Sequence, residues 1–338
     1  MAWVLWPDRK ALFDEMLKIA RNDTERAEVV TAFASIAGPH ASELLWSVLD
    51  QSDSTKELLA VVHHSLQQMY FGRSYYDRSQ LTAGRRRRVQ AALEPHIGQG
   101  QPSTRFLAIS LLAPVAAERS LEELRHMMDD ATIPANIRDD AFQLMLLISM
   151  PTERTKEAIA ALSQNEQGRQ RVALRFLALG TDALTQLTQS KIFISTGMFD
   201  ESFGLTSRSV QTGEAIVPTA PRGVKPEHVR PLLTSSDAEI AALAGYLLTL
   251  LGEPDGLEPL IAYWRTQPKN QEVDRLVYRA IAVHDDPQYI PLLREIYGRL
   301  KQQWDQQEFY WTIRIMGGPE ILEFRKRLRK DIGVGNLQ

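Results

Sequence analysis

Apolar residues recur at intervals of three and four along most of the chain. One such set falls at i, i+3, i+4, i+7 and i+8, which is a single face of an α-helix: Val273, Leu276, Val277, Ala280 and Ile281. Polar loops lead into comparable runs in "DDATIPANIRDDAFQLMLLI", "SQNEQGRQRVALRFLAL" and "TSSDAEIAALAGYLLTLL". The pattern predicts amphipathic helices, each of which needs a neighbour to bury its apolar face.

A second pattern marks the junctions between these runs, where a helix breaker is followed by proline, as in "LTLLGEPDGLEPLIAYW" and "IRIMGGPEILEFRKRL". Proline suits the first turn of a helix, because that position needs no N–H donor. The prolines placed in this way are Pro39, Pro114, Pro151, Pro254, Pro287 and Pro319. The breakers Gly252, His284 and Gly317 are 32 and then 33 residues apart by subtraction. That spacing is typical of a repeat made of two helices.

This pattern resembles the HEAT repeat family, in which proline stands near the start of the first helix and arginine and alanine mark the second. The matching pairs are Arg138 with Ala141, Arg171 with Ala173, and Arg279 with Ala280. The resemblance implies an all-α fold, an α-solenoid (superhelix) of about eight irregular HEAT-like hairpins that covers most of the chain. In that family the curved inner face usually holds a protein, less often a nucleic acid and rarely a small substrate.

His284, Asp285 and Asp286 stand side by side and resemble a metal or acid–base site. His284 occupies the place of Gly252 and Gly317 in the neighbouring junctions, and such a position often adopts the left-handed conformation that His, Asn and Asp tolerate. Asp285 or Asp286 is then expected to cap the next helix. We therefore interpret the three residues as the end of one helix and the start of another.

Two segments interrupt the repeats, and the first runs from 69 to 88, "MYFGRSYYDRSQLTAGRRRR". Its six arginines and single aspartate leave a local charge of +5, with aromatic residues interleaved. Phosphates with splayed bases, or an acidic protein groove, would suit such a segment. The candidate partner-binding residues here are Tyr70, Arg73, Tyr75, Tyr76, Arg78, Arg85, Arg86, Arg87 and Arg88.

The arginine run allows two interpretations. If Thr82 caps a helix containing "RRRRVQAALEPHI", successive arginines point about 100° apart and cannot form one flat patch. They also lie at the positive end of the helix dipole, which costs about 0.3–1 kcal/mol per exposed charge unless an anion is near. A bound anion or acidic partner would remove this conflict. The alternative is a solvated helix end whose arginine stems cover apolar surface.

The second interruption, residues 190–225, is much longer than an ordinary loop between helices. "KIFIS" and "EAIVP" have the β-branched character of short strands and are predicted to pair as a small hairpin, or else to form a non-helical loop. We expect the insert to cap the groove or contact a partner, with Phe199 and Phe203 as candidate contacts. It divides the chain into N-terminal repeats (1–189), the insert, and C-terminal repeats with a terminal capping helix (226–338).

The sequence offers little support for catalysis. It contains no cysteine, no phosphate-binding glycine loop, no G-x-S-x-G elbow and no H-E-x-x-H pair. The acidic pairs Asp129–Asp130 and Asp139–Asp140 are expected at turns or helix starts, where they cap backbone N–H groups. Some HEAT-like proteins are DNA glycosylases or lyases, and the glycosylases use aromatic residues and an acid in a basic cleft. The candidate aromatic residues Trp264, Trp304 and Trp311 are interpreted as core or rim residues.

These patterns lead to one main hypothesis and two alternatives. The main hypothesis is a non-catalytic scaffold or adaptor that binds another protein, with no catalytic, cofactor-binding or metal-binding residue assigned. The net charge of −3, from 39 Lys and Arg against 42 Asp and Glu, gives no global reason to expect a polyanion partner. The first alternative is therefore nucleic-acid or polyanion binding through the local Tyr70–Arg88 segment, and the second is a HEAT-like enzyme. No signal peptide or membrane span is recognisable, so we expect a cytoplasmic chain without a membrane partner, which could be part of a longer protein.

Overall fold

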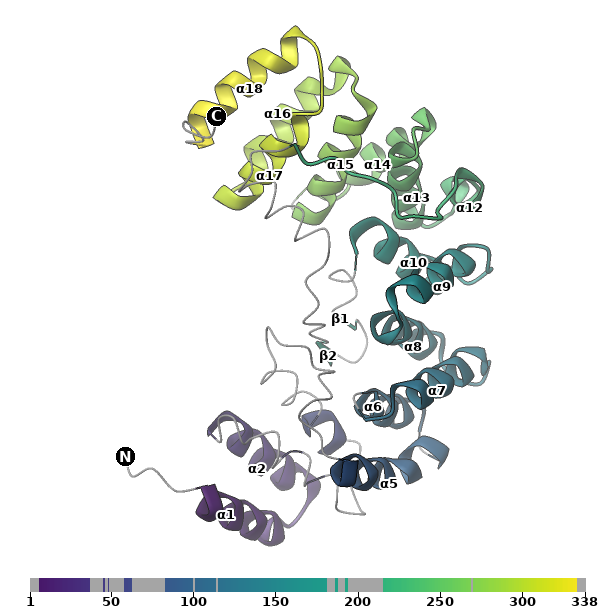
Figure 1. The fold of residues 1–338 in the computed structure, drawn as a ribbon, viewed down its shortest axis with the longest axis vertical. Helices are drawn as coiled ribbons and strands as arrows, with labels where there is room; N and C mark the ends of the chain where they lie inside the picture. The colour runs from purple at the N-terminus through teal and green to yellow at the C-terminus, as the bar shows by residue number, and fades with distance from the viewer. Residues whose placement is uncertain are drawn as a thin grey trace. The chain divides into compact units, whose positions relative to one another are not determined.

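The computed structural model describes residues 6–36, 45, 48, 58–62, 83–99, 101–113, 115–180, 186–187, 192–193, 215–268 and 270–332. In this part the chain is all-α, apart from one pair of two-residue strands (Figure 1). The chain forms two compact units. Unit 1 comprises Met1–Met150 and Leu184–Met198, and unit 2 comprises Pro151–Ala183 and Phe199–Gln338.

Unit 1 is built from helices that pack on their neighbours in the sequence. Its described helices are α1 (Trp6–Ile19), α2 (Asp23–Ile36), α5 (Ala83–Gln99), α6 (Pro102–Leu112), α7 (Ala117–Asp129) and α8 (Ala135–Ile148). Helix α1 packs on α2, and α5, α6, α7 and α8 contact each other in succession, with α6 also touching α8. The predicted helix containing the arginine run is confirmed as α5.

Unit 2 continues with helices in pairs. They are α9 (Pro151–Leu162), α10 (Gln167–Leu179), α12 (Pro226–Val229), α13 (Ala238–Leu250), α14 (Leu257–Arg265), α15 (Gln271–His284), α16 (Ile290–Arg299), α17 (Gln303–Ile313) and α18 (Pro319–Ile332), with 3-10 turns η4 (Arg230–Thr234), η5 (Pro254–Gly256) and η6 (Pro287–Tyr289). Helices α10, α13, α15 and α17 contact one another in that order. We call these four the second helices of unit 2. The first three are each preceded by a first helix or short helical turn that packs beside it, and the Tyr297 ring of α16 lies 5.5 Å from the Phe309 ring of α17.

Proline starts the described first helices, as the sequence predicts. Pro151 and Pro319 are the first residues of α9 and α18, and Pro254 and Pro287 begin η5 and η6 ahead of α14 and α16. Pro39 and Pro114 lie outside the described residues. The second helices α13 and α15 begin with side-chain caps instead. Asn270 accepts hydrogen bonds from Glu272 N and Val273 N, and so satisfies two donors in the first turn of α15.

The left-handed residue between α15 and η6 is Asp285 (φ 53°), not His284 as predicted. His284 is the last helical residue, and its ring packs edge-on against Tyr289 at 5.8 Å. Gly252 (φ 86°) and Gly318 (φ 91°) take the same conformation, so the three left-handed positions 252, 285 and 318 are each 33 residues apart. The prediction missed by one residue because α15 includes His284, the apparent breaker, as its last residue. The predicted cap is confirmed, since Asp286 accepts a hydrogen bond from Gln288 N at 2.9 Å.

One acidic pair lies where the sequence did not place it. Asp139 and Asp140 are inside α8, because that helix begins at Ala135 directly after Pro134. Asp140 is only 3% exposed and belongs to the buried face of the helix, not to its first turn. Asp130, in contrast, closes a turn after α7 as expected and accepts from Thr132 N at 2.9 Å.

The core of unit 2 lies between its helix pairs. The five apolar residues predicted on one face of α15 are all at most 4% exposed. At one contact the backbones themselves touch. A Cβ on Gly245 of α13 would lie 2.3 Å from the carbonyl oxygen of Gly256, and a Cβ on Gly256 would lie 2.2 Å from that of Gly245. Any side chain at either position would force α13 away from η5 and α14.

The long insert is described only at its edges. Strand β1 (Gln186–Leu187) pairs antiparallel with β2 (Ile192–Phe193). The pairing predicted between "KIFIS" and "EAIVP" is not seen: Ile192 and Phe193 pair with preceding residues, and residues 215–220 form neither helix nor strand. The middle of the insert, with Phe199 and Phe203, lies outside the described residues. The division at 190–225 stays a prediction.

Candidate interaction surfaces

Arginines on α10 pair with carboxylates at the start of α13. Arg171 forms an ion pair with Asp237, and Arg175 Nε lies 2.6 Å from Glu239 Oε1. Arg171 Nε also lies 3.5 Å from Glu239. Arg171 is one of the arginines that carry the family resemblance, and its role here is to join one second helix to the next.

Asp237 has two roles in this contact. Besides pairing with Arg171, it caps α13 by accepting hydrogen bonds from Glu239 N at 2.9 Å and Ile240 N at 3.2 Å. Burial alone would raise the pKa of Asp237, but the hydrogen bonds from Arg171 and the backbone together with the arginine charge outweigh it, and the pKa is lowered. The carboxylate is therefore held in its charged form, as a cap and ion-pair partner must be.

The same arrangement recurs between α15 and α17, where Glu308 is the centre. This glutamate is only 2% exposed, and it accepts a 2.6 Å hydrogen bond from Arg279 Nη2 and lies 3.1 Å from Arg275 Nε. Tyr278 of α15 and Tyr246 of α13 are buried beside these charges, at 2% and 1% exposure. Burial, with the Glu308 charge, raises the pKa of Tyr278 well above its usual value. A buried ion-pair network thus ties α15 to α17.

This network is suited to holding helices together and not to proton transfer. Its tyrosines stay protonated at neutral pH, because burial raises the pKa of Tyr246 as well. Each arginine already has a carboxylate partner. A general acid or base needs a pKa near the working pH, so these two tyrosines, whose pKa is raised above its ordinary value, do not fit that role.

The tryptophans considered for base stacking are mostly buried. Trp264 and Trp311 are 2% and 3% exposed, while Trp304 on α17 is half-buried. Trp264 donates from Nε1 to Asp274 at 2.6 Å, and the guanidinium of Arg299 lies over its ring at 4.1 Å from the centroid. Burial raises the pKa of Asp274 despite this hydrogen bond. The interpretation of Trp264 and Trp311 as core residues is confirmed, and Trp264 joins α14, α15 and the end of α16.

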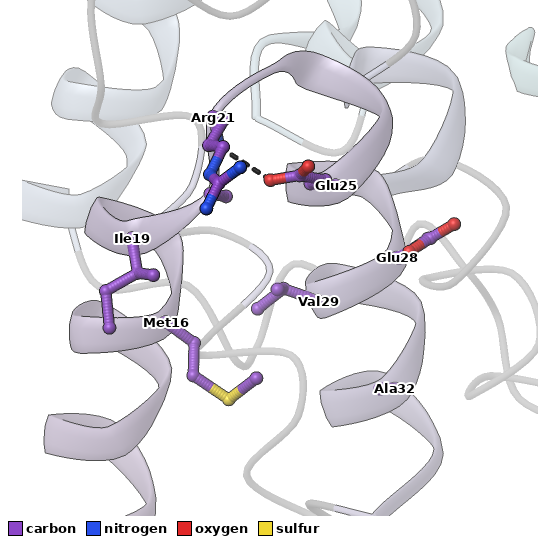
Figure 2. A pocket seen from close by; sticks show the side chains of 8 residues that line it. Met16, Ile19, Arg21, Glu25, Glu28, Val29 and Ala32 are labelled. Carbon is purple, nitrogen blue, oxygen red and sulfur yellow. Dashed lines mark hydrogen bonds between the residues drawn. The ribbon is translucent and has the colours of Figure 1, made fainter.

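An open apolar groove lies between α1 and α2 in unit 1 (Figure 2). It has a volume of about 530 Å³ and is lined by Met16, Ile19, Ala20, Arg21, Glu25, Glu28, Val29 and Ala32. Met16 points from α1 towards Val29 of α2, while Glu25 accepts a hydrogen bond from Arg21 N at 2.7 Å at the rim. Glu25 also donates its backbone N–H to Asn22 Oδ1 at 3.0 Å, so the Asn22 side chain caps the start of α2.

The groove exists because α1 carries two apolar stripes. Phe13 and Leu17 are buried against the rest of unit 1. A second stripe at i, i+4 and i+7 stays in solvent, with Leu12 47%, Met16 40% and Ile19 69% exposed. This groove was not predicted from the sequence. A count of apolar faces on "ALFDEMLKIA" would have found it, because two adjacent stripes are more than one contact can bury.

The predicted basic segment is only partly described. Arg85, Arg86, Arg87 and Arg88 lie in the first two turns of α5, where Arg87 is exposed and Arg86 half-buried. The side chains of Arg85 and Arg88 lie outside the described set. So do Tyr70, Arg73, Tyr75, Tyr76 and Arg78 in full. The arginines' position at the positive end of a helix dipole is confirmed, and contact between them and the tyrosines stays a prediction.

Within the described ranges, no three His, Asp or Glu side chains are grouped so that they could hold a metal ion. No helix in the described part of the chain is long and apolar enough to cross a membrane. No protein-family model and no curated protein matches the sequence.

Proposed function

We propose that the chain is an α-solenoid of HEAT-like hairpins that acts as a non-catalytic scaffold and binds another protein. The observation that carries the binding role is the exposed apolar stripe of Leu12, Met16 and Ile19, which we call the α1 stripe. It borders the groove that Val29 lines from α2. The fitting partner is an amphipathic helix, which would lie along the groove with its apolar face against Met16 and Ile19.

Three features of unit 2 support the solenoid. Its second helices contact in succession, and the ion pairs of Arg171 with Asp237 and of Arg279 with Glu308 join one second helix to the next. The left-handed positions recur every 33 residues, at 252, 285 and 318. A repeat in which each hairpin contacts only its neighbours would have these three properties.

The groove supports a protein partner for energetic reasons. Ile19 is 69% exposed, so folding of the chain buries little of its apolar surface. Met16, one helical turn away, is 40% exposed and increases the apolar surface that the stripe leaves in water. Burying such a side chain in an interface is worth about 1.5–3 kcal/mol. Arg21 and Glu28 at the rim would supply orienting polar contacts, as interface rims usually do.

The test is a comparison of Ile19→Asp with Leu322→Asp, a leucine on α18 that is 49% exposed and far along the sequence from the groove. Proteins captured from native extract by the wild type are identified, and their affinities for the purified variants are measured. We expect Ile19→Asp to weaken binding about 10- to 100-fold, the equivalent of about 1.5–3 kcal/mol, while Leu322→Asp leaves it unchanged.

A photo-crosslinking residue at position 19 gives a second readout. It should attach to the captured protein, whereas the same residue at position 322 should not. The proposal fails if both aspartate variants keep wild-type affinity and position 19 crosslinks to nothing.

The alternative of polyanion binding is favoured by one observation. Arginines 85–88 sit in the first two turns of α5, and no acidic residue occurs in the first turn of this helix. An anion there would meet both the arginines and the helix dipole. The test is the affinity for single-stranded RNA at increasing salt concentration. The affinity of the wild type should then fall steeply, and that of an Arg86→Ala, Arg87→Ala double variant should not.

A further inference from the structure

Carboxylates border the groove between α1 and α2 on both of its helices. Glu28 of α2 is exposed and lines the groove. Figure 2 shows its side chain leaving α2 on the side away from α1, so it lies at the outer edge of the α2 wall. Glu15 of α1 is exposed as well. The charge of these edges bears on which kind of helix the groove can bind.

The position of Glu15 follows from the helical period. It comes three residues after Leu12 and four before Ile19, so it lies beside the α1 stripe on the surface of the helix. Met16 and Ala20, which line the groove, are about 100° and 140° further round α1. Glu15 therefore borders the stripe on the side turned away from α2. Together with the glutamate at the outer edge of α2, it places negative charge on opposite sides of one apolar surface.

The nearby cations do not balance these two carboxylates. Lys18 is exposed, but it is at least about 100° round the helix from every residue of the α1 stripe. Arg21 lies at one end of the groove, in the turn between α1 and α2. There the Glu25 carboxylate accepts its backbone N–H at 2.7 Å. Among the described side chains, the charges along the two long sides of the apolar surface are therefore those of Glu15 and Glu28.

We propose that the groove binds a basic amphipathic helix, in which Lys or Arg residues flank the apolar stripe on both sides. This rests on the proposed binding role of the groove and adds the charge of its partner. The α1 stripe covers roughly 10 Å of helix, so the apolar residues of the partner recur over the same two turns. Charged positions beside an apolar seam set partner choice in paired helices. Cations there meet Glu15 and Glu28, whereas an acidic helix with the same apolar stripe is repelled.

Two synthetic peptides of about 18 residues, long enough to form a helix, are the probes. Both have the same leucine stripe on an alanine-rich helix. The residues flanking the stripe are lysine in the first, the Lys peptide, and glutamate in the second, the Glu peptide. Fluorescence anisotropy of the labelled peptides measures their affinities for the wild type and for variants folded by far-UV circular dichroism. The variants are Glu15→Lys with Glu28→Lys, the control Glu118→Lys with Glu122→Lys at exposed positions of α7, and Ile19→Asp.

We expect the wild type to bind the Lys peptide about 5- to 50-fold more tightly than the Glu peptide at low salt, because each groove carboxylate attracts one peptide and repels the other. The preference should shrink at about 1 M salt, where the screening length is about 3 Å. The Glu15→Lys, Glu28→Lys chain should prefer the Glu peptide. The α7 control has the same net charge as that chain and should keep the wild-type preference.

The inference is overturned if the wild type binds both peptides equally or prefers the Glu peptide. It is also overturned if the Glu15→Lys, Glu28→Lys chain keeps the wild-type preference. Ile19→Asp distinguishes these results from failure of the proposed function, because it should weaken the binding of both peptides. If neither peptide binds the wild type, or if Ile19→Asp leaves both affinities unchanged, the proposed function and the inference fail together.

Discussion

Asp285 accepts a hydrogen bond through Oδ1 from the backbone N–H of Gly317, 3.0 Å away and 32 positions later in the chain. Asp285 itself is left-handed, as are Gly252 and Gly318 at the equivalent points of the adjacent junctions. Asp285 therefore has two roles. It makes the turn that glycine makes elsewhere, and it holds the next turn through its side chain.

Substitutions at Asp285 should separate the contributions of these two roles to stability. Asp285→Asn keeps an acceptor and tolerates the left-handed conformation, so the free energy of unfolding should change by less than about 0.5 kcal/mol. Asp285→Gly keeps the turn but loses the hydrogen bond, at about 0.5–1 kcal/mol. Asp285→Ala loses both and should cost about 1–3 kcal/mol. Urea unfolding of the three variants measures their free energies of unfolding and so tests the expected order.

His284→Gly is the control for this series. It places glycine at the end of α15, so it should destabilise the chain by about 0.5–1 kcal/mol. A stabilised His284→Gly variant would instead mean that the left-handed turn lies at 284, as the sequence pattern had indicated.

Glu308 is expected to be the most sensitive position in the polar network. Glu308→Ala leaves Arg275 and Arg279 without their shared carboxylate in a buried site, which should cost about 3–5 kcal/mol in the free energy of unfolding. Glu308→Gln keeps the shape and one acceptor and should cost less. Thermal or urea unfolding gives both values.

The matched control is Glu323→Ala on α18. That glutamate is 56% exposed and pairs with Arg327 at 3.6 Å, so its loss should cost no more than about 0.5 kcal/mol. Equal effects at Glu308 and Glu323 would show that burial of the network contributes nothing.

The helices and their starts were predictable because they depend on local rules. Proline at 151, 254, 287 and 319 marks the first turn of each first helix or its leading 3-10 turn. The apolar period of α15 identified its buried face correctly. A one-residue error at His284 arose because helix length is set by packing, and the breaker pattern alone does not report where the last turn ends.

The contacts between distant segments were not predictable in the same way. Nothing in "EAIVPTAPRGVK" indicates that Ile216 reaches Trp311, because a single backbone hydrogen bond over 95 positions leaves no periodic signal. Arg171 and Arg279 were noted because they resemble a repeat signature. Their partners Asp237 and Glu308 lie at or in the following second helix, and the sequence alone does not pair them. The groove between α1 and α2 was within reach of the sequence, since both stripes of α1 are visible in it.

Asp140 should make unit 1 less stable as the pH rises. Burial, with a smaller contribution from Asp139, raises the pKa of Asp140 from 3.8 to about 7 in the folded chain. The folded state therefore binds this proton more tightly than the unfolded state. The contribution of Asp140 to the free energy of unfolding is largest below about pH 4 and declines as the pH rises towards 7. Asp140→Asn removes the charge and should stabilise the chain by about 1–3 kcal/mol at pH 8, with little difference at pH 4.

The decisive measurement is the difference in the free energy of unfolding between wild type and Asp140→Asn at pH 4, 6 and 8, because other titrating groups cancel in that difference. Asp129→Asn, at an exposed carboxylate at the end of α7, is the control for removing a charge from the surface and should change the free energy of unfolding by no more than about 0.5 kcal/mol. If the Asp140→Asn difference does not change with pH, the Asp140 carboxyl has the same pKa in the folded and unfolded chains, and burial within α8 does not perturb it.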